Sequence, residues 1–260
     1  MALLNGSPAT TSDLENLALT NYGHFTSMRV DDGTVRGLSL HLARLARDCQ
    51  AVFGAKLDTD RVRDYIRAAI QQQPRLVTVR VTIYDPSMTM GTVGKSAHPQ
   101  VLVTTRPAGQ LSPDPFNATT ARFSRDTATV KHIGLFSQLK QRREALAAGA
   151  DDVVFVEADG AISEGATWNL GFVDPDGQVV WPDAPVLAGV TMQLLQQAHT
   201  DWRYSAVAVE HMGQMRAAFA TNVSIGVRAV RAIDKTRFDD DDPVLDVLRK
   251  AYAELPGESL

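Results

Sequence analysis

Three residues between positions 131 and 169 have side chains that could carry out chemistry together. Lys131 stands just ahead of a predicted helix, Glu164 follows 33 residues later within Ser-Glu-Gly, and Asn169 begins an apolar strand after five more residues. A lysine amine can form an imine with an aldehyde and then move a proton. A carboxylate beside a ring nitrogen keeps that nitrogen protonated. The stretch therefore pairs a possible imine-forming amine with an acid, although each residue taken alone is more simply an ordinary surface lysine or turn carboxylate.

A second group of residues could bind an anion such as a phosphate. Gly189, Val190 and Thr191 come directly before a predicted helix, and the free N–H groups and positive dipole end of that helix form a seat for a phosphate. The simpler alternative is that Thr191 only caps its helix. Lys140 is a rival imine-forming lysine, but it lies in mid-helix nine residues after Lys131, on the opposite face, where we expect it to be solvated.

The elements that position these residues predict an α+β protein with two domains. In the first half, alternating and helically spaced apolar residues predict strands and helices, and Ser39 is the expected N-cap of the first helix. These elements are strands at 25–30, 76–85 and 100–105 and helices from 39 and over 59–72. Residues 106–118 hold three prolines and a glycine without periodic apolar positions, which predicts a linker. The predicted domains are 1–105, small and N-terminal, and 119–260, larger and sheet-rich.

The larger domain is expected to contain a hairpin across the turn Asp159-Gly160. Its predicted strands are 118–124, 151–158, one containing 169–173, 179–182, 205–210 and 224–230, and its helices are 135–148, 191–199 and 242–255. The acidic run from Asp239 to Asp242 is expected to be a solvated loop or helix start, so no metal site is predicted. The single cysteine, Cys49, falls on the apolar side of a helix and is expected to pack in the core.

Composition restricts the kinds of partner. The chain has 260 residues, is 44% hydrophobic and carries a formal net charge of −4, which argues against a nucleic-acid surface built from clustered Lys and Arg. No apolar run approaches the roughly 20 residues that span a bilayer. The opening MALLNGSPATTSDLENL lacks a basic region followed by an apolar one. We therefore expect no membrane partner and a cytoplasmic location.

The order of the candidate residues resembles the class IV aminotransferases, a family of pyridoxal-phosphate (PLP) enzymes that includes branched-chain aminotransferases, D-amino acid aminotransferases and aminodeoxychorismate lyases. Family members carry a lysine before a helix, A-x-x-x-G-A/C-x-E/D, D-G-x-hydrophobic-x-E-G/C-x-x-x-N and L-x-G-I-T. The chain matches in order with Lys131, Ala145 to Ala150, Asp159-Gly160, Glu164-Gly165, Asn169 and Leu187 to Thr191. The segment HFTSMRVDDGTVRGLSLHLARL is similar to G-x-F-x-T-x-R-V-x-D-G…H-x-x-R-L. The resemblance spans residues 20 to 231.

The resemblance implies the two-domain fold type IV, with PLP as cofactor. Lys131 would form the Schiff base, Glu164 would hold the pyridine nitrogen, and Arg44, from H-x-x-R-L, would bind the phosphate. Further cofactor contacts are implied for Asn169, Val190, Thr191, Thr221 and Asn222. Arg29 and Arg80 lie on strands that border the active site in this family, so each could bind a substrate carboxylate, and structural ion pairing explains each equally well. Family active sites lie at the domain interface and borrow a partner's loop, which implies a homodimer.

Three functions compete. The first is transfer of an amino group between an amino acid and a 2-oxo acid, which we favour. The second is an aminodeoxychorismate lyase-like elimination: many branched-chain members have a Glu where this chain has Thr26, and the lyase branch often has a Thr there. The third is a degenerate homologue that acts as a binding or scaffold dimer. Retention of Lys131, Glu164 and Arg44 argues against it.

Overall fold

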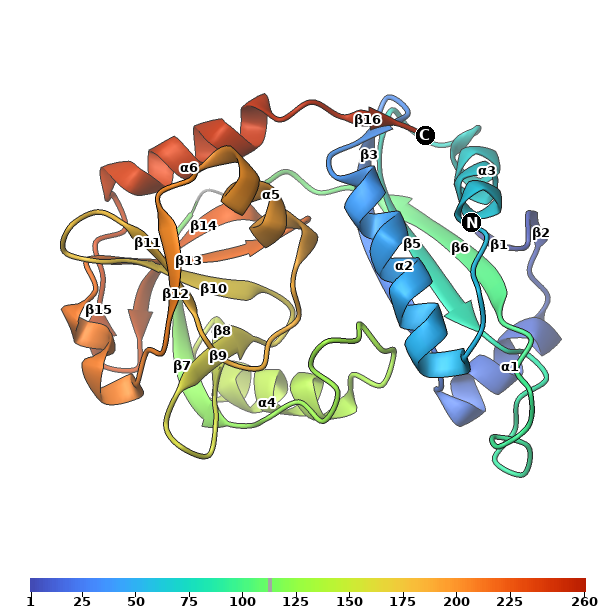
Figure 1. The fold of residues 1–260 in the computed structure, drawn as a ribbon, viewed down its shortest axis with the longest axis horizontal. Helices are drawn as coiled ribbons and strands as arrows, with labels where there is room; N and C mark the ends of the chain where they lie inside the picture. The colour runs from blue at the N-terminus through green and yellow to red at the C-terminus, as the bar shows by residue number, and fades with distance from the viewer. Residues whose placement is uncertain (112–113) are drawn as a thin grey trace. The chain divides into compact units, whose positions relative to one another are not determined.

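The computed structural model describes residues 1–111 and 114–260, which divide into two compact units (Figure 1). Unit 1 comprises Met1–Gly109, Val130–Gly134 and Pro256–Leu260, and unit 2 comprises Gln110–Thr129 and Leu135–Leu255. Two segments expected in the C-terminal domain, Val130–Gly134 and Pro256–Leu260, therefore pack with unit 1. The predicted linker includes residues 112 and 113, which lie outside the described residues.

Unit 1 is a seven-stranded antiparallel sheet with helices on its sides. Its strand order is β16-β4-β3-β5-β6-β1-β2. The strands are β1 (Ala2–Leu4), β2 (Ser7–Pro8), β3 (His24–Asp31), β4 (Thr34–Val35), β5 (Leu76–Tyr84), β6 (Gln100–Pro107) and β16 (Glu258–Ser259), and the helices are α1 (Thr11–Thr20), α2 (Leu38–Phe53) and α3 (Thr59–Ile70). The sequence analysis predicted β3, β5, β6, α2 and α3 but none of the elements before residue 24.

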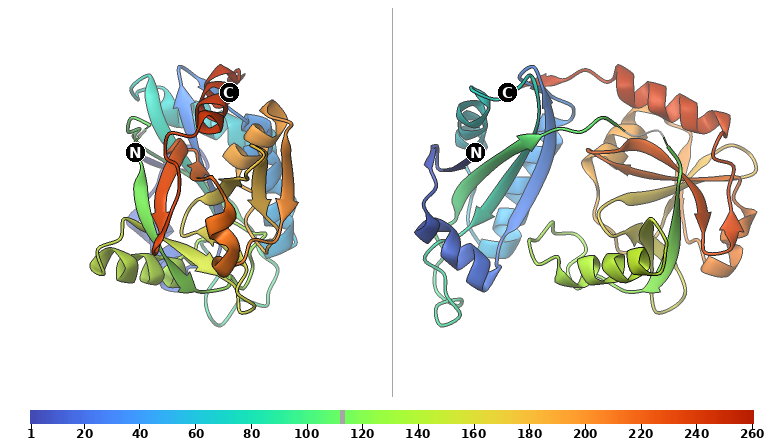
Figure 2. Two further views of the ribbon diagram at one scale, coloured as in Figure 1. Left: turned by 90° about the vertical axis from the view of Figure 1, so that its left-hand side faces the viewer. Right: turned by 180° about the vertical axis from the view of Figure 1, so that it is seen from behind.

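Alternation along the strands explains why α2 and α3 cover one face of this sheet (Figure 1 and Figure 2). Met28 and Val30 of β3 and the valines of β5 face the two helices, whose apolar residues lie at helical spacing. Cys49 is fully buried in this core, as predicted. The predicted N-cap is wrong: Gly37 caps α2, and Ser39 instead donates from its N–H to the Glu258 carboxylate at 3.0 Å.

Unit 2 is built on a nine-stranded mixed sheet. Its strands are β7 (Phe116–Arg122), β8 (Asp152–Val156), β9 (Ile162–Gly165), β10 (Asn169–Val173), β11 (Val179–Pro182), β12 (Trp202–Ser205), β13 (Ala217–Asn222), β14 (Gly226–Ile233) and β15 (Thr236–Arg237). The helices are α4 (Phe136–Ala147), α5 (Val190–Ala198), the 3-10 helix η1 (Val209–Gln214) and α6 (Pro243–Glu254). Pairings close the ring β10-β13-β14-β7-β8-β9, because β9 also pairs with β10. The apolar core includes Leu170, Phe172 and Ala220.

One strand prediction in unit 2 is wrong. Residues 205–210 do not form a strand: β12 ends at Ser205, Ala208 makes one isolated bridge with Ala161, and η1 begins at Val209. The apolar alternation of this segment has another cause: Val207 packs its side chain in the core although the segment around it is not a strand. The predicted strand containing 169–173 is confirmed as β10, and residues 162–165 before it form the separate strand β9, which pairs antiparallel with β10.

The acidic run leads into a helix start, one of the two predicted alternatives, although its last residue, Asp242, is buried. Asp242 caps α6 and accepts a hydrogen bond from Arg216 Nη2 at 2.6 Å, and Asp240 pairs with Arg231 at 2.9 Å. Across the described ranges, no three His, Cys, Asp or Glu residues form a group that could hold a metal ion. No helix in the described part of the chain combines the length and apolar character that crossing a membrane requires.

Candidate functional site

Lys131 has its main chain fixed inside unit 1. Its N–H donates to Oδ2 of Asp48 on α2 at 3.0 Å, and its carbonyl accepts from the N–H of Phe25 on β3 at 2.9 Å. The Lys131 Nζ lies 5.0 Å from the centre of the Phe25 ring. The rival Lys140 instead pairs with Glu144 at 3.3 Å, and its side chain is 54% exposed. Of these two lysines, only Lys131 is positioned by contacts between distant parts of the chain.

Arg44 is a buried cation on α2 whose nearest hydrogen-bond partners are neutral. Its Nη2 donates to the Thr26 hydroxyl, and that hydroxyl lies 2.7 Å from Nδ1 of His41. Burial lowers the pKa of Arg44 to about 10, while Asp48 raises it and Arg47 lowers it further. Burial and then the Arg44 charge lower the pKa of His41 well below its ordinary value, so its ring is neutral. The Arg44 Nε has no hydrogen-bond partner among the described residues, which leaves a donor for an anion.

Asp48 was missed by the sequence analysis. It is fully buried, and besides the Lys131 N–H it accepts a hydrogen bond from Arg47 Nη2 at 2.7 Å. Its place on the helix could have identified it, because Asp48 lies on the same face of α2 as the buried Leu45 and Cys49. A carboxylate predicted to be buried needs a partner. Asp48 ties α2 to the segment that carries Lys131.

Three buried polar residues form one row across the sheet of unit 2. Glu164 on β9 lies opposite Asn169 on β10, and Asn169 lies opposite Thr221 on β13. Residues directly opposite each other in antiparallel strands point to the same face of the sheet. The neighbouring pair Leu170 and Ala220 points to the other face, into the apolar core. The chain reversal between β9 and β10 is therefore what brings Glu164 beside Asn169.

The loop before α5 packs directly on this row. Asn169 Nδ2 donates to the Leu187 carbonyl at 2.7 Å, and the Leu187 N–H donates to Oε2 of Glu164 at 3.3 Å. A Cβ added to Gly189 would lie 2.0 Å from Asn169 Oδ1, so only glycine fits there. Gly189 is the N-cap of α5 and no side chain caps the helix, which removes the alternative that Thr191 is a simple cap.

Val190 and Thr191 are the first two residues of α5 and both are buried, so the free N–H groups of the first turn lie next to the polar row. The Thr221 hydroxyl is buried and has no hydrogen-bond partner in the described parts of the protein. Asn222 uses its side chain to shape the turn after β13, accepting from the Ser224 N–H at 2.7 Å and donating to the Thr167 carbonyl at 3.1 Å.

Arg125 is a second residue that sequence reasoning missed. Its Nη1 lies 3.1 Å from Oε1 of Glu164 and 3.2 Å from the Ala128 carbonyl. The Arg125 and Glu164 side chains are each only 7% exposed. No local sequence pattern marks Arg125 as a site residue, because its partner Glu164 lies 39 residues further along the chain.

The two predicted substrate arginines lie in unit 1. Arg80 on β5 stacks on the Phe25 ring, with its Cζ 3.6 Å from the ring centre. Arg29 on β3 donates from Nη1 to the Gly109 carbonyl at 2.6 Å. Neither arginine forms an ion pair with a described carboxylate, which removes the alternative that they serve as structural ion pairs.

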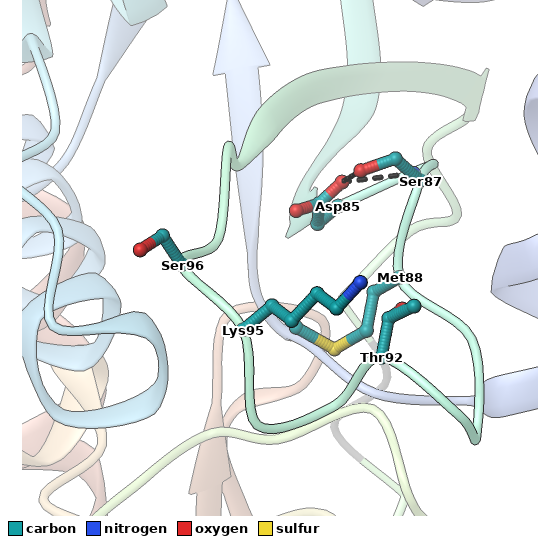
Figure 3. Close-up of a pocket in the computed structure, with 6 residues that line it drawn as sticks. All are labelled: Asp85, Ser87, Met88, Thr92, Lys95 and Ser96. Atoms are coloured by element: carbon teal, nitrogen blue, oxygen red, sulfur yellow. Dashed lines mark hydrogen bonds between the residues drawn. The ribbon is translucent and has the colours of Figure 1, made fainter.

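A hollow in the loop after β5 contains none of the predicted site residues (Figure 3). Its lining residues are Asp85, Ser87, Met88, Thr92, Lys95 and Ser96. Asp85 accepts from the Ser87 N–H at 2.8 Å and from the His98 N–H at 2.7 Å, and these bonds hold the loop in shape. We therefore attribute this hollow to the folding of the loop and assign it no role in the candidate site.

The described groups fit a phosphorylated aldehyde. Unit 1 supplies a positioned amine and a buried cation, and unit 2 supplies a buried carboxylate, a glycine-shaped loop at a helix start and an unpartnered buried hydroxyl. An amine for the aldehyde, a carboxylate for the ring nitrogen and donors for the phosphate are the groups that PLP enzymes use. Each unit therefore carries groups of the types that PLP enzymes use.

Residues 23–233 match the family model for amino-transferase class IV, and the chain belongs to this family. No curated protein sequence matches the chain significantly. The predicted family and its two-domain α+β fold are therefore confirmed, and the chain is an aminotransferase-family enzyme.

Solved structures agree with this fold. A branched-chain aminotransferase from Thermoproteus uzoniensis with norvaline superposes with a TM-score of 0.87 at 17% identity, over 97% of this chain and 93% of that one. The branched-chain aminotransferase from Escherichia coli gives 0.86 at 20% identity, over 98% and 93%. A hypothetical aminotransferase from Mycobacterium tuberculosis in its PLP-bound form gives 0.83 at 20% identity, over 97% of both chains.

Proposed function

We propose that this chain is a PLP-dependent aminotransferase that moves an amino group between an amino acid and a 2-oxo acid, with Lys131 as the Schiff-base lysine. The observation that carries the proposal is the row Glu164, Asn169 and Thr221 under the Gly189 loop. Glu164 and Asn169 have polar partners in the protein, whereas the buried Thr221 hydroxyl has none among the described residues, and burying an unpartnered hydroxyl costs free energy. A polar ligand bound over this row would supply the missing hydrogen bond.

The chain's own residues have the following proposed roles with PLP. Arg44, and Val190 and Thr191 in the first turn of α5, would bind the phosphate, and Thr221 and Asn222 in the turn after β13 would add donors to it. Glu164 accepts a hydrogen bond from the pyridine nitrogen and keeps it protonated, and Asn169 holds the Gly189 loop against Glu164.

Bound PLP supplies an electron sink for the electron pair released at the substrate Cα. Lys131 would form the Schiff base and would take up the proton that leaves the substrate Cα. The neutral partners of Arg44, the Thr26 hydroxyl and the His41 ring, leave its positive charge for the phosphate. Arg29 and Arg80 bind the substrate carboxylate in this proposal.

The homodimer and the cytoplasmic location belong to the same proposal and rest on the family resemblance and the sequence. Size-exclusion chromatography with light scattering tests the dimer. A fully active monomer would contradict it.

A lyase is the second candidate, because Thr26 occupies the position where many branched-chain members carry a Glu, and here its hydroxyl is fixed between Arg44 and His41. Dependence on an acceptor separates the two. An aminotransferase consumes a 2-oxo acid for each amino group moved, whereas a lyase releases its product without one. A non-catalytic homologue would do neither.

The decisive experiment is an absorbance spectrum of the purified protein with PLP, before and after borohydride. Lys131→Ala is compared with Lys140→Ala, whose lysine is exposed and paired on the surface of α4. We expect wild type and Lys140→Ala to give a yellow species that borohydride fixes to the protein, and Lys131→Ala to give none. A colourless wild type, or covalent cofactor on Lys131→Ala, would reject the assignment.

A further inference from the structure

Lys131 lies in a short extended segment that docks along the edge of β3 in unit 1. The neighbouring strand β4 pairs with the last two residues of β3, and the Lys131 segment pairs with the start of the same strand. The Phe25 N–H donates to the Lys131 carbonyl at 2.9 Å, and the Ile133 N–H donates to the Gly23 carbonyl at 3.0 Å. Strand pairing thus fixes the segment to β3 through the carbonyl of Lys131.

Asp48 on α2 fixes the other main-chain group of Lys131. Its Oδ2 accepts the Lys131 N–H at 3.0 Å, while its Oδ1 accepts from Nε and Nη2 of Arg47 at 3.0 and 2.7 Å. The Asp48 side chain is 1% exposed, and a buried carboxylate is costly unless its oxygens have partners. One oxygen is therefore committed to Arg47 and the other to the Lys131 main chain, which is held by β3 on one side and by α2 on the other.

The same face of α2 carries the arginine that we propose for the phosphate. Arg44 precedes Asp48 by four residues, so the two side chains are neighbours on the helix, and both are buried. Burial lowers the pKa of Arg44 to about 10, while the Asp48 charge raises it. Burial and then the charges of Arg44 and Lys131 lower the pKa of His41, one turn earlier on this face. The charges of both cations therefore act at one face of α2.

The placement of these two cations matters for a ligand that must reach both. PLP carries its aldehyde and its phosphate arm on neighbouring atoms of one rigid ring. The amine and the arginine must therefore be held at a matching separation, and groups that are held in place before binding lose less free energy than mobile ones. Asp48 connects the two, because it belongs to the helical turn that follows Arg44 and its Oδ2 holds Lys131.

We propose that Asp48 is a positioning residue that sets the place of the Lys131 amine relative to Arg44, so that one phosphorylated aldehyde can engage both. It acts through these two residues and not through contact with the ligand. The inference rests on the proposed function, because PLP is the ligand that needs both groups.

The test compares PLP with pyridoxal, which has the same aldehyde but no phosphate. Uptake of each is titrated by absorbance on full-length wild type, Asp48→Ala and Asp48→Asn. Loss of a negative charge beside Arg44 would by itself strengthen the preference for PLP. We expect the opposite for Asp48→Ala, a fall in the preference for PLP over pyridoxal of about tenfold or more, because a hydrogen bond to a charged group is lost. Asp48→Asn keeps an oxygen that can accept the Lys131 N–H, so it should retain the wild-type preference.

Asp242 provides a matched control in unit 2. Its carboxylate is also 1% exposed, accepts from Arg216 Nη2 at 2.6 Å and accepts a main-chain N–H, that of Val244, at 2.9 Å. Its hydrogen-bond partners are not part of the candidate site. Asp242→Ala removes the same kind of buried carboxylate, and we expect it to leave the preference for PLP unchanged. An equal fall in Asp242→Ala and Asp48→Ala would indicate general destabilisation and overturn the inference.

Exchange of the Lys131 amide hydrogen gives a second readout that needs no cofactor. We expect this exchange to be about tenfold faster or more in Asp48→Ala, and close to the wild-type rate in Asp48→Asn and Asp242→Ala. Unchanged exchange in Asp48→Ala, or faster exchange with an unchanged preference for PLP, would overturn the inference and leave the proposed function standing. A wild type that takes up neither aldehyde would reject both together.

Discussion

Replacing Arg125 by Met should destabilise unit 2 strongly. Arg125 and Glu164 are 3.1 Å apart and each side chain is 7% exposed, so Arg125→Met leaves a buried carboxylate without its cation. Removing one partner of a buried ion pair typically costs about 3–5 kcal/mol, most of it for the uncompensated charge. Arg231 and Asp240 form a pair at 2.9 Å in the same unit, but their side chains are 45% and 28% exposed, so Arg231→Met should cost about 1 kcal/mol or less.

The assay is urea unfolding followed by tryptophan fluorescence. All three tryptophans lie in unit 2, so the signal reports on that unit. The double variant Arg125→Met, Glu164→Gln removes both charges, and we expect it to lose less stability than the sum of the two single variants. If Arg125→Met costs no more than Arg231→Met, or if the two single effects simply add, then the ion pair with Arg125 does not stabilise the buried Glu164.

Two further predictions concern the glycine loop and a buried histidine. Gly189→Ala should lower the unfolding free energy by about 1–3 kcal/mol, because the added Cβ would lie 2.0 Å from Asn169 Oδ1. The control Gly94→Ala places its Cβ where no atom lies within 4 Å, so it should leave the unfolding free energy unchanged in the same urea titration. Burial lowers the pKa of His24 from 6.5 to about 4, while the Asp48 charge raises this pKa and the Arg44 charge lowers it. As pH falls, His24 is therefore protonated in the unfolded chain before it is protonated in the folded protein. The unfolding free energy should therefore drop by up to about 3 kcal/mol between these pH values. His24→Asn should remove that part of the pH dependence, and an unaltered profile would contradict the assignment.

The local elements followed from the sequence because their signals are local. Apolar residues at every second position predicted β3 and β5, and helical spacing predicted α2 and α3. One error shows the limit of this signal. The alternation in 205–210 looked like a strand, although beyond Ser205 only Ala208 is bridged. Periodicity reports which side chains are buried, but it does not report which neighbour supplies the backbone hydrogen bonds.

The order of the motifs predicted which side chains could carry out chemistry, namely Lys131, Arg44, Glu164, Asn169 and the residues of the Gly189 loop. Only the folded structure shows which partners these side chains have. Asp48 reaches the Lys131 N–H across 83 positions, and Arg125 reaches Glu164 across 39. These contacts arise from strand pairing and helix packing between segments that are distant in the sequence. The same is true of the strand register that aligns Glu164, Asn169 and Thr221. No local residue pattern predicts such contacts.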